Sequence, residues 1–182
     1  YPAIKPMIAS DFSFFRKKVS NNIWRILFLV FLTEESDKEL VIYYVLLNAF
    51  KYGNEVIFRR NLNCVNKALK YSRKVSHEAH KWKGFLRFSK MKGNIYYTKF
   101  HADANILGIL ANHFVKRLAN EYWVILDVGR NILCLYDKRE VTFCYGEDIH
   151  LQFHKDEDER EMEELWRVFF QTIAIKERKN LR

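Results

Sequence analysis

The stretch "FLRFSKMKGNIYYTKF", Phe85 to Phe100, marks the point at which the periodicity of this sequence changes. On either side of Lys92 and Gly93 the residues alternate in polarity, the pattern of two β-strands joined by a tight turn. Upstream of Gly84 the apolar residues instead recur every three or four positions, as they do in amphipathic helices. The stretch therefore predicts a β-hairpin at the junction between a helical lead and a strand-containing core.

The helical lead is expected to contain three helices. The first follows a cap at Asn21 or Asn22, and the second, "KELVIYYVLLNAFKY", begins after Asp37 and ends at Gly53, a residue suited to the C-cap. The third runs from about residue 63 to residue 83, where Gly84 is expected to stop it. On a helical wheel its apolar residues share one face and its lysines share the opposite face.

The sequence after the first hairpin repeats the order of a hairpin and a helix. A helix is expected from Asp103, a good N-cap, to Leu118, and "YWVILDV" and "ILCLYD" predict a second hairpin around residues 129–131. "VTFCY" predicts a further strand, and a last helix begins in the acidic run and continues through "LWRVFFQTIAI". We expect the α+β class: an antiparallel sheet built from two hairpins, with helices mainly on one face, preceded by a helical subdomain. The helical lead would occupy residues 1–83 and the core residues 84–182, together forming one compact unit.

The bulk composition is that of a globular intracellular protein. The chain has 182 residues, 49% of them hydrophobic, which is enough for a sizeable core. Its longest apolar run, "IWRILFLVFL", is far shorter than a membrane span requires, and no secretory leader is recognisable. The three cysteines lack the spacing of a metal site and are typical of reduced thiols. We expect a cytoplasmic protein that does not bind a membrane.

The positive charge of the chain is concentrated in one region. The whole sequence has a net charge of +9, whereas residues 51–100 alone contain 13 Lys and Arg against two acids, a balance of +11. Residues 156–164, "DEDEREMEE", contain seven acids. Like charges repeated along one helix face repel one another, so a stripe formed by Lys67, Lys70, Lys74 and Lys81 indicates a polyanionic partner. An ordinary solvated lysine-rich surface is the alternative.

The histidines give little support for a metal site or a cofactor. His77 and His80 are three residues apart, whereas the zinc protease motif places its histidines four apart on one helix face. His101 and His113 add no recognisable ligand spacing. The sequence has no nucleophile elbow, no phosphate-binding glycine loop and no dinucleotide fingerprint. We therefore expect no metal and no cofactor.

Four blocks, "HEAHKWKGFLRF", "NILGILANHFVKRL", "WVILDVGR" and "LWRVFFQTIAIKERKN", resemble in order those of a bacterial domain-of-unknown-function family. Its members are described as DNA metabolism proteins. The resemblance covers about residues 19–182 and implies a link to a DNA modification/repair radical S-adenosylmethionine (SAM) protein, or fusion to uracil-DNA-glycosylase-like domains. It implies a pathway but no reaction. The family pattern has recurrent polar residues at Glu78, His80, Lys83, Arg87, His113, Arg117, Asp127, Arg130, Glu177, Arg178 and Asn180.

The basic region and the resemblance together favour a DNA-metabolism accessory domain that binds nucleic acid. It would act in DNA repair beside a radical SAM or uracil-DNA-glycosylase-like partner. The candidate nucleic-acid-binding residues are Lys67, Lys70, Lys74, Lys81, Lys83, Arg87, Arg117, Arg130 and Arg178. The alternative is an enzyme acting on nucleic acid or a nucleotide, with Glu78, His80, His113 and Asp127 as acid/base candidates. An adaptor that docks protein partners is a third possibility.

Overall fold

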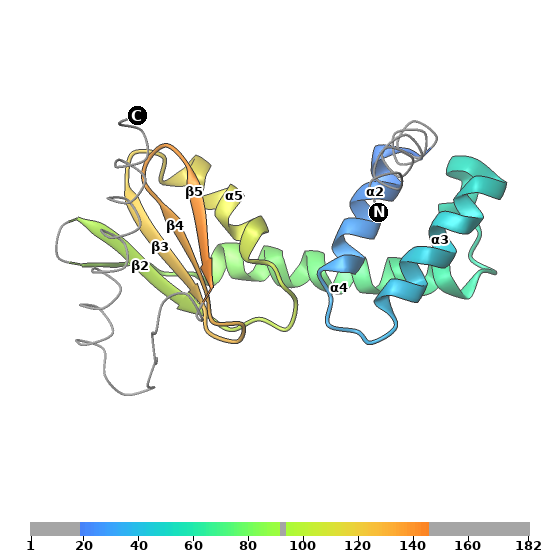
Figure 1. The fold of residues 1–182 in the computed structure, drawn as a ribbon, viewed down its shortest axis with the longest axis horizontal. Helices are drawn as coiled ribbons and strands as arrows, with labels where there is room; N and C mark the ends of the chain where they lie inside the picture. The colour runs from blue at the N-terminus through green and yellow to red at the C-terminus, as the bar shows by residue number, and fades with distance from the viewer. Residues whose placement is uncertain (1–18, 92–93, 146–182) are drawn as a thin grey trace, which may run out of the picture. The chain divides into compact units, whose positions relative to one another are not determined.

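The computed structural model describes residues 19–91 and 94–145, which form two compact units (Figure 1). The first contains the described residues up to His80 together with Asp103–Ile106, and the second contains Lys81–Ala102 and the described residues from Leu107 onward. The elements in chain order are α2 (Asn21–Phe31), α3 (Lys38–Tyr52), the 3-10 helix η1 (Gly53–Phe58), α4 (Asn63–Phe85), β1 (Ser89–Lys90), β2 (Ile95–Phe100), α5 (Leu107–Arg117), β3 (Tyr122–Asp127), β4 (Ile132–Tyr136) and β5 (Val141–Tyr145).

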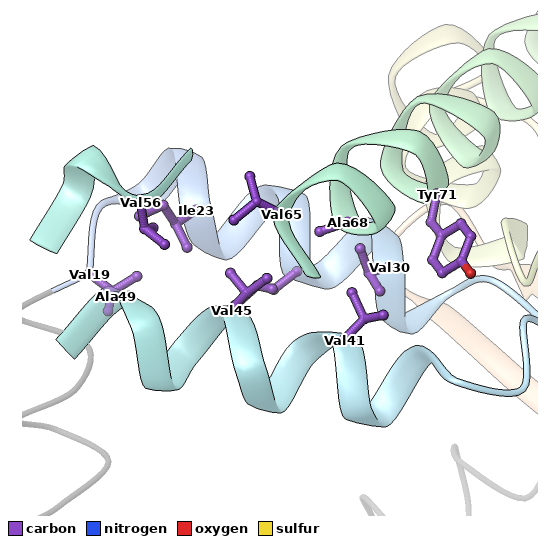
Figure 2. Packing of buried hydrophobic residues seen from close by; sticks show 11 residues of the cluster. Val19, Ile23, Val30, Val41, Val45, Ala49, Val56, Val65, Ala68 and Tyr71 are labelled. Carbon is purple, nitrogen blue, oxygen red and sulfur yellow. The ribbon is translucent and has the colours of Figure 1, made fainter. Parts of the chain in front are cut away.

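The first unit is a helical unit built around one apolar core (Figure 2). Each of its helices contributes small or branched side chains three or four residues apart, which lie on one helix face. In α3 these are Val41, Val45 and Ala49, and Figure 2 shows them directed toward the residues of α2 and α4. Among the described residues, no helix is both long and apolar enough to cross a membrane.

The positions predicted for the helices of this part are largely confirmed. Helices α2, α3 and α4 lie where they are predicted, and Gly53 ends α3 with a positive φ of 58°, which glycine adopts without strain. Asp37 precedes α3, but its carboxylate makes no capping hydrogen bond to the helix. It accepts hydrogen bonds from Lys67 Nζ at 2.5 Å and from Tyr71 Oη at 2.9 Å, and so holds the start of α3 against α4.

The second unit contains a five-stranded sheet in the order β1-β2-β3-β4-β5. The pairs β1–β2, β3–β4 and β4–β5 are antiparallel, as the two predicted hairpins and the further strand require. Helix α5 packs against β3 and β4 and is drawn in yellow beside the sheet in Figure 1. The expected α+β class is therefore confirmed, with a mostly antiparallel sheet after a helical part.

The two hairpins are joined by a parallel pair, β2–β3, whose register runs from Ile95 opposite Tyr122 to Phe100 opposite Asp127. Parallel neighbours need a crossover connection, and here the connection is the segment that contains α5. This pairing places the carboxyl ends of β2 and β3 at the same edge of the sheet. The sheet is therefore mixed, although antiparallel pairs predominate.

Strand β3 is the centre of this unit because both of its faces are buried. Its residues Trp123, Val124, Ile125 and Leu126 point alternately to the two faces, and each is at most 1% exposed. The Trp123 ring stacks on Tyr136 of β4 with a centroid distance of 5.1 Å. An almost uninterrupted apolar strand is typical of a position covered on both sides.

Three boundaries differ from the sequence expectations. Helix α4 continues through Gly84 to Phe85, and β1 is limited to two residues. Helix α5 begins at Leu107 and not at Asp103, whose backbone N–H is bound to Glu78 of α4. The acidic run and the last predicted helix lie outside the described residues.

The central position of β3 leads to a first prediction. Changing Leu126→Ala should lower the free energy of unfolding by about 2–5 kcal/mol, because the side chain is fully buried and its removal leaves a cavity. Val128→Ala, two residues further on at a position that is 44% exposed, is the control and should cost less than about 0.5 kcal/mol. Urea-induced unfolding of both variants measures the difference, and equal losses would contradict the central role of β3.

Candidate functional site

Asp127, the last residue of β3, has a completely buried carboxylate that organises the turn after it. Its Oδ1 accepts hydrogen bonds from the backbone N–H groups of Gly129 at 3.1 Å and Arg130 at 3.3 Å. Its Oδ2 accepts a hydrogen bond from Arg130 Nη1 at 3.2 Å. A buried carboxylate is costly unless it is paired and hydrogen-bonded, and these three donors meet that need. The arrangement suits Asp127 to holding the turn rather than to exchanging protons with a substrate.

Arg130 extends this interaction to the neighbouring strand. Its Nη1 also donates to the backbone carbonyl of Ala102 at 3.1 Å, just after β2, and only 17% of its side chain is exposed. One turn residue earlier, the N–H of Val128 donates to the carbonyl of Phe100 at 3.0 Å. The carboxyl ends of the two parallel strands are therefore fastened together, at the kind of edge where α/β proteins bind ligands.

His101 lies directly over this turn, a position that no local sequence pattern indicates. A Cβ atom added at Gly129 would come within 2.8 Å of both Nδ1 and Cε1 of the His101 ring. Glycine is therefore required at position 129 for the ring to stay in place, while the imidazole itself is exposed. Only the parallel pairing of β2 with β3 brings His101 beside the Asp127 turn, and that pairing is not visible in the sequence pattern.

A second group in this unit consists of Lys83, His113 and Arg117, which we call the basic cluster. His113 and Arg117 are one turn apart on α5, and the edge-to-face contact of Phe88 with Phe114 at 4.9 Å holds this helix near the end of α4. Burial lowers the pKa of His113 below its usual value, and the positive charges of Lys83 and Arg117 lower it further. The three side chains therefore form one electrostatic group.

The basic cluster has unused hydrogen-bonding capacity. His113 Nε2 is buried and has no hydrogen-bond partner among the described residues. Within the same part of the chain, neither Lys83 nor Arg117 forms an ion pair with an acid. A half-buried imidazole near two cations that form no ion pair among the described residues is an arrangement that a bound anion would stabilise.

The lysine stripe predicted on α4 is divided between two roles. Lys67 forms an ion pair with Asp37, which raises the pKa of Lys67 and lowers that of Asp37, and Lys74 Nζ lies 3.4 Å from Glu35. These two lysines hold α4 to the segment between α2 and α3. The side chain of Lys70 is exposed to solvent, where a binding partner can reach it.

The remaining basic candidates lie near the end of α4 or outside the described residues. Lys81 is exposed, with Nζ at 5.9 Å from the centre of the Phe85 ring. Arg87 donates from Nη1 to the carbonyls of Gly84 at 2.7 Å and Leu86 at 3.1 Å, which satisfies acceptors at the end of the helix. Arg178 lies outside the described residues, as do Glu177 and Asn180.

The acid/base candidates of the first unit are Glu78 and His80. The two carboxylate oxygens of Glu78 accept hydrogen bonds from the backbone N–H groups of Asp103 at 2.7 Å and Ala104 at 3.0 Å. Glu78 therefore holds the loop before α5, while His80 is exposed at the surface. His113 and Asp127 belong to the second unit, in the two separate groups described above.

The first unit also has an open cavity of about 310 Å³, lined by Thr33, Glu34, Glu35, Lys74, Asp103 and Ala104. Three of these residues are acidic, so the cavity is unfavourable for phosphate. No three His, Cys, Asp or Glu side chains gather as a metal site within residues 19–91 and 94–145. Of the free thiols, Cys134 is buried, and burial raises its pKa, whereas Cys64 and Cys144 are half-buried.

Comparison with family models relates this fold and these residues to a defined group of proteins. The model of a family described as "Domain of unknown function" (DUF4130) matches residues 36–182, which include both residue groups of the sheet unit. The chain belongs to this family. Comparisons with curated proteins and with solved structures found no match. The DUF4130 match begins just before α3 and so leaves α2 outside it.

The Asp127 turn of this DUF4130 protein leads to a second prediction. Asp127→Ala should lower the free energy of unfolding by about 3 kcal/mol, because it removes a buried carboxylate that accepts two backbone hydrogen bonds and pairs with the Arg130 guanidinium. Asp137→Ala is a matched control: Asp137 accepts backbone hydrogen bonds from Arg139 and Glu140 in a turn, at 2.9 and 2.8 Å. Its loss should cost about 1 kcal/mol. Similar losses in chemical unfolding would show that the buried ion pair adds nothing to the turn.

Proposed function

We propose that this DUF4130 protein binds nucleic acid, DNA in particular, through phosphate contacts made by the basic cluster. The observation that carries the proposal is that Lys83, His113 and Arg117 form one electrostatic group. Lys83 belongs to residues 51–100, whose balance of 13 basic against two acidic residues is the most positive feature of the sequence. A bound phosphate would neutralise the two cations of the group.

A binding role is favoured over an acid/base enzyme by the state of the candidate carboxylates. Asp127 and Glu78 already use their oxygens to accept backbone hydrogen bonds, and Asp127 has no exposed surface. A general base must instead be able to reach a proton of the substrate. The residues with unused polar atoms are cationic or neutral, which suits recognition of phosphate more than proton abstraction.

The proposed biological role is that of an accessory domain in DNA metabolism. Support comes from the resemblance of four sequence blocks to a family linked to a radical SAM protein and to uracil-DNA-glycosylase-like domains. Such a partner would carry out the chemistry, while the basic cluster and the exposed Lys81 of the same unit would hold the phosphate backbone. Contacts of this kind position a protein on DNA and carry little sequence information.

The third prediction concerns the cations of the basic cluster. The double variant Lys83→Ala, Arg117→Ala should weaken binding to both duplex and single-stranded DNA at least tenfold at moderate salt. Each lost phosphate contact should reduce the slope of log affinity against log salt by about 0.9 for duplex DNA, so by up to about 1.8 in total. Fluorescence anisotropy with mixed-sequence oligonucleotides over a salt series measures both quantities.

Its control is the double variant Lys90→Ala, Lys116→Ala, which removes the same charge from exposed positions of β1 and α5. We expect less than a threefold change for this control. If both double variants weakened binding equally, the effect would come from net charge and the basic cluster would have no special role. If neither did, the proposal would be wrong.

The fourth prediction uses the titration of His113. Its pKa is lowered in the free protein, so the ring is neutral near pH 7, and a bound phosphate should raise that pKa. Binding then takes up a proton, and DNA affinity should increase as the pH falls through and below about 6.5. His113→Gln should lose this pH dependence, whereas His77→Gln, at an exposed position of α4, should retain it. A pH-independent parent would contradict the binding of phosphate near His113.

A further inference from the structure

Helix α3 is apolar on two opposite faces, and among the described residues only one of these faces is packed against other side chains. Val41, Val45 and Ala49 enter the core of the first unit. On the opposite side of the helix lie Leu40, Tyr43, Tyr44 and Leu47, which are 60%, 58%, 49% and 51% exposed. We call these four residues the α3 stripe. A helix that is hydrophobic on all sides is normally buried on all sides, so the stripe is a surface without its counterpart.

The order of residues in the α3 stripe is the same in both directions. Leu40 and Leu47 lie at equal distances from the point midway between Tyr43 and Tyr44. In an antiparallel pair of such helices related by a two-fold axis through this point, Leu40 of one copy meets Leu47 of the other. Tyr43 of one copy lies level with Tyr44 of the other, and Tyr44 with Tyr43. An isologous contact requires this kind of self-complementarity, and here the residue types as well as the spacing meet it.

Electrostatics allow this contact despite the net charge of +9. The stripe contains no charged residue, and the charged residues of α3 are Lys38, Glu39 and Lys51 near its two ends. The basic excess of the chain is carried by residues 51–100. Repulsion between two copies therefore acts mostly at long range, where salt screens it.

We propose that the α3 stripe pairs with the α3 stripe of a second copy of this chain in the antiparallel, two-fold arrangement. Covering the exposed halves of four large side chains, two of them aromatic, buries on the order of 400 Å² per copy and 800 Å² per pair. This is the size of a weak, reversible interface. The proposal is independent of nucleic-acid binding.

Contacts within a single copy already order side chains of the α3 stripe, which limits the entropy lost on association. The Tyr43 and Tyr44 rings contact each other edge to face at 5.3 Å. Asn48 Nδ2 donates to the backbone carbonyl of Tyr44 at 2.8 Å, so the polar group nearest the stripe already has a partner. The tyrosine hydroxyls can remain hydrated at the rim while the rings are covered.

The experiment that tests the pairing measures the mass of the complete chain by sedimentation over a range from about 1 to 300 µM. We expect a reversible monomer–dimer equilibrium for the parent protein, which higher salt strengthens or leaves unchanged because screening reduces repulsion. Leu47→Glu and Leu40→Lys should each weaken the dimer at least tenfold. Phe58→Glu, at a 70% exposed residue of η1, is the matched control and should have no such effect.

The double variant Leu40→Lys, Leu47→Glu distinguishes an antiparallel from a parallel pair of α3 helices. In the antiparallel pair each introduced cation meets the introduced carboxylate of the other copy, so dimerisation should recover at least partly. In a parallel pair like charges would meet and the double variant would remain monomeric. Circular dichroism and thermal unfolding check that the variants fold, which is expected because both positions are exposed.

Single cysteine substitutions give a second test that does not rely on affinity. Oxidation should cross-link Tyr43→Cys with itself, since its two copies differ in height by only about 1.5 Å along the helices. It should not cross-link Leu40→Cys with itself, because its two copies differ by about 10 Å, beyond disulfide reach. The parent chain with its three native cysteines is oxidised alongside as the control.

Two results would overturn the proposal. One is a chain that stays monomeric at the highest concentration, and the other is a dimer that Leu47→Glu leaves intact. A monomeric chain that binds phosphatidylcholine vesicles through the stripe, with binding lost in Leu47→Glu, would assign this surface to a lipid interface. DNA binding by the monomeric variants at parental affinity would leave the proposed function standing, so the two proposals fail separately.

Discussion

A carboxylate without any exposed surface must have hydrogen-bond donors, and the sheet unit is arranged to supply them to Asp127. The chain turns back on itself so that the N–H groups of Gly129 and Arg130 face this residue, and the Arg130 guanidinium returns to complete the set. The same guanidinium reaches Ala102 beyond β2. One buried negative charge thus fixes a turn, the alignment of two parallel strand ends and the position of the His101 ring above Gly129.

Two carboxylates of the helical unit also hold segments together by accepting hydrogen bonds, but they are more exposed to solvent than Asp127. Asp37 binds Lys67 and Tyr71, and Glu78 binds the backbone ahead of α5. These carboxylates join segments that are 25 to 34 residues apart in sequence, and so they connect parts of the fold that no single helix connects. Surface ion pairs contribute little free energy individually, so their main effect here is to select one arrangement.

The sequence predicted local structure well and long-range partners poorly. Alternation and turn residues located the strands, and periodicity located the core face of α4, because each depends on neighbours within a few positions. The parallel pairing of β2 with β3 depends on a crossover, which no local pattern reports. Periodicity predicts that Lys67 and Lys74 lie on the face of α4 opposite the core. It does not predict their partners Asp37 and Glu35, which are at least 30 residues away from them in sequence. His101 was overlooked as a site residue for the same reason.

The three cysteines offer a practical consequence of this division into two units. Cys134 is buried and its thiol resists ionisation, so alkylating reagents should leave it unmodified in the folded protein. Cys64 lies on α4 in the helical unit and Cys144 lies on β5 in the sheet unit, and both are half-buried. The natural sequence therefore provides one attachment point for a spectroscopic label in each unit. Pairs of fluorophores or spin labels at these thiols would report the distance between the units, with and without DNA, without the introduction of any new cysteine.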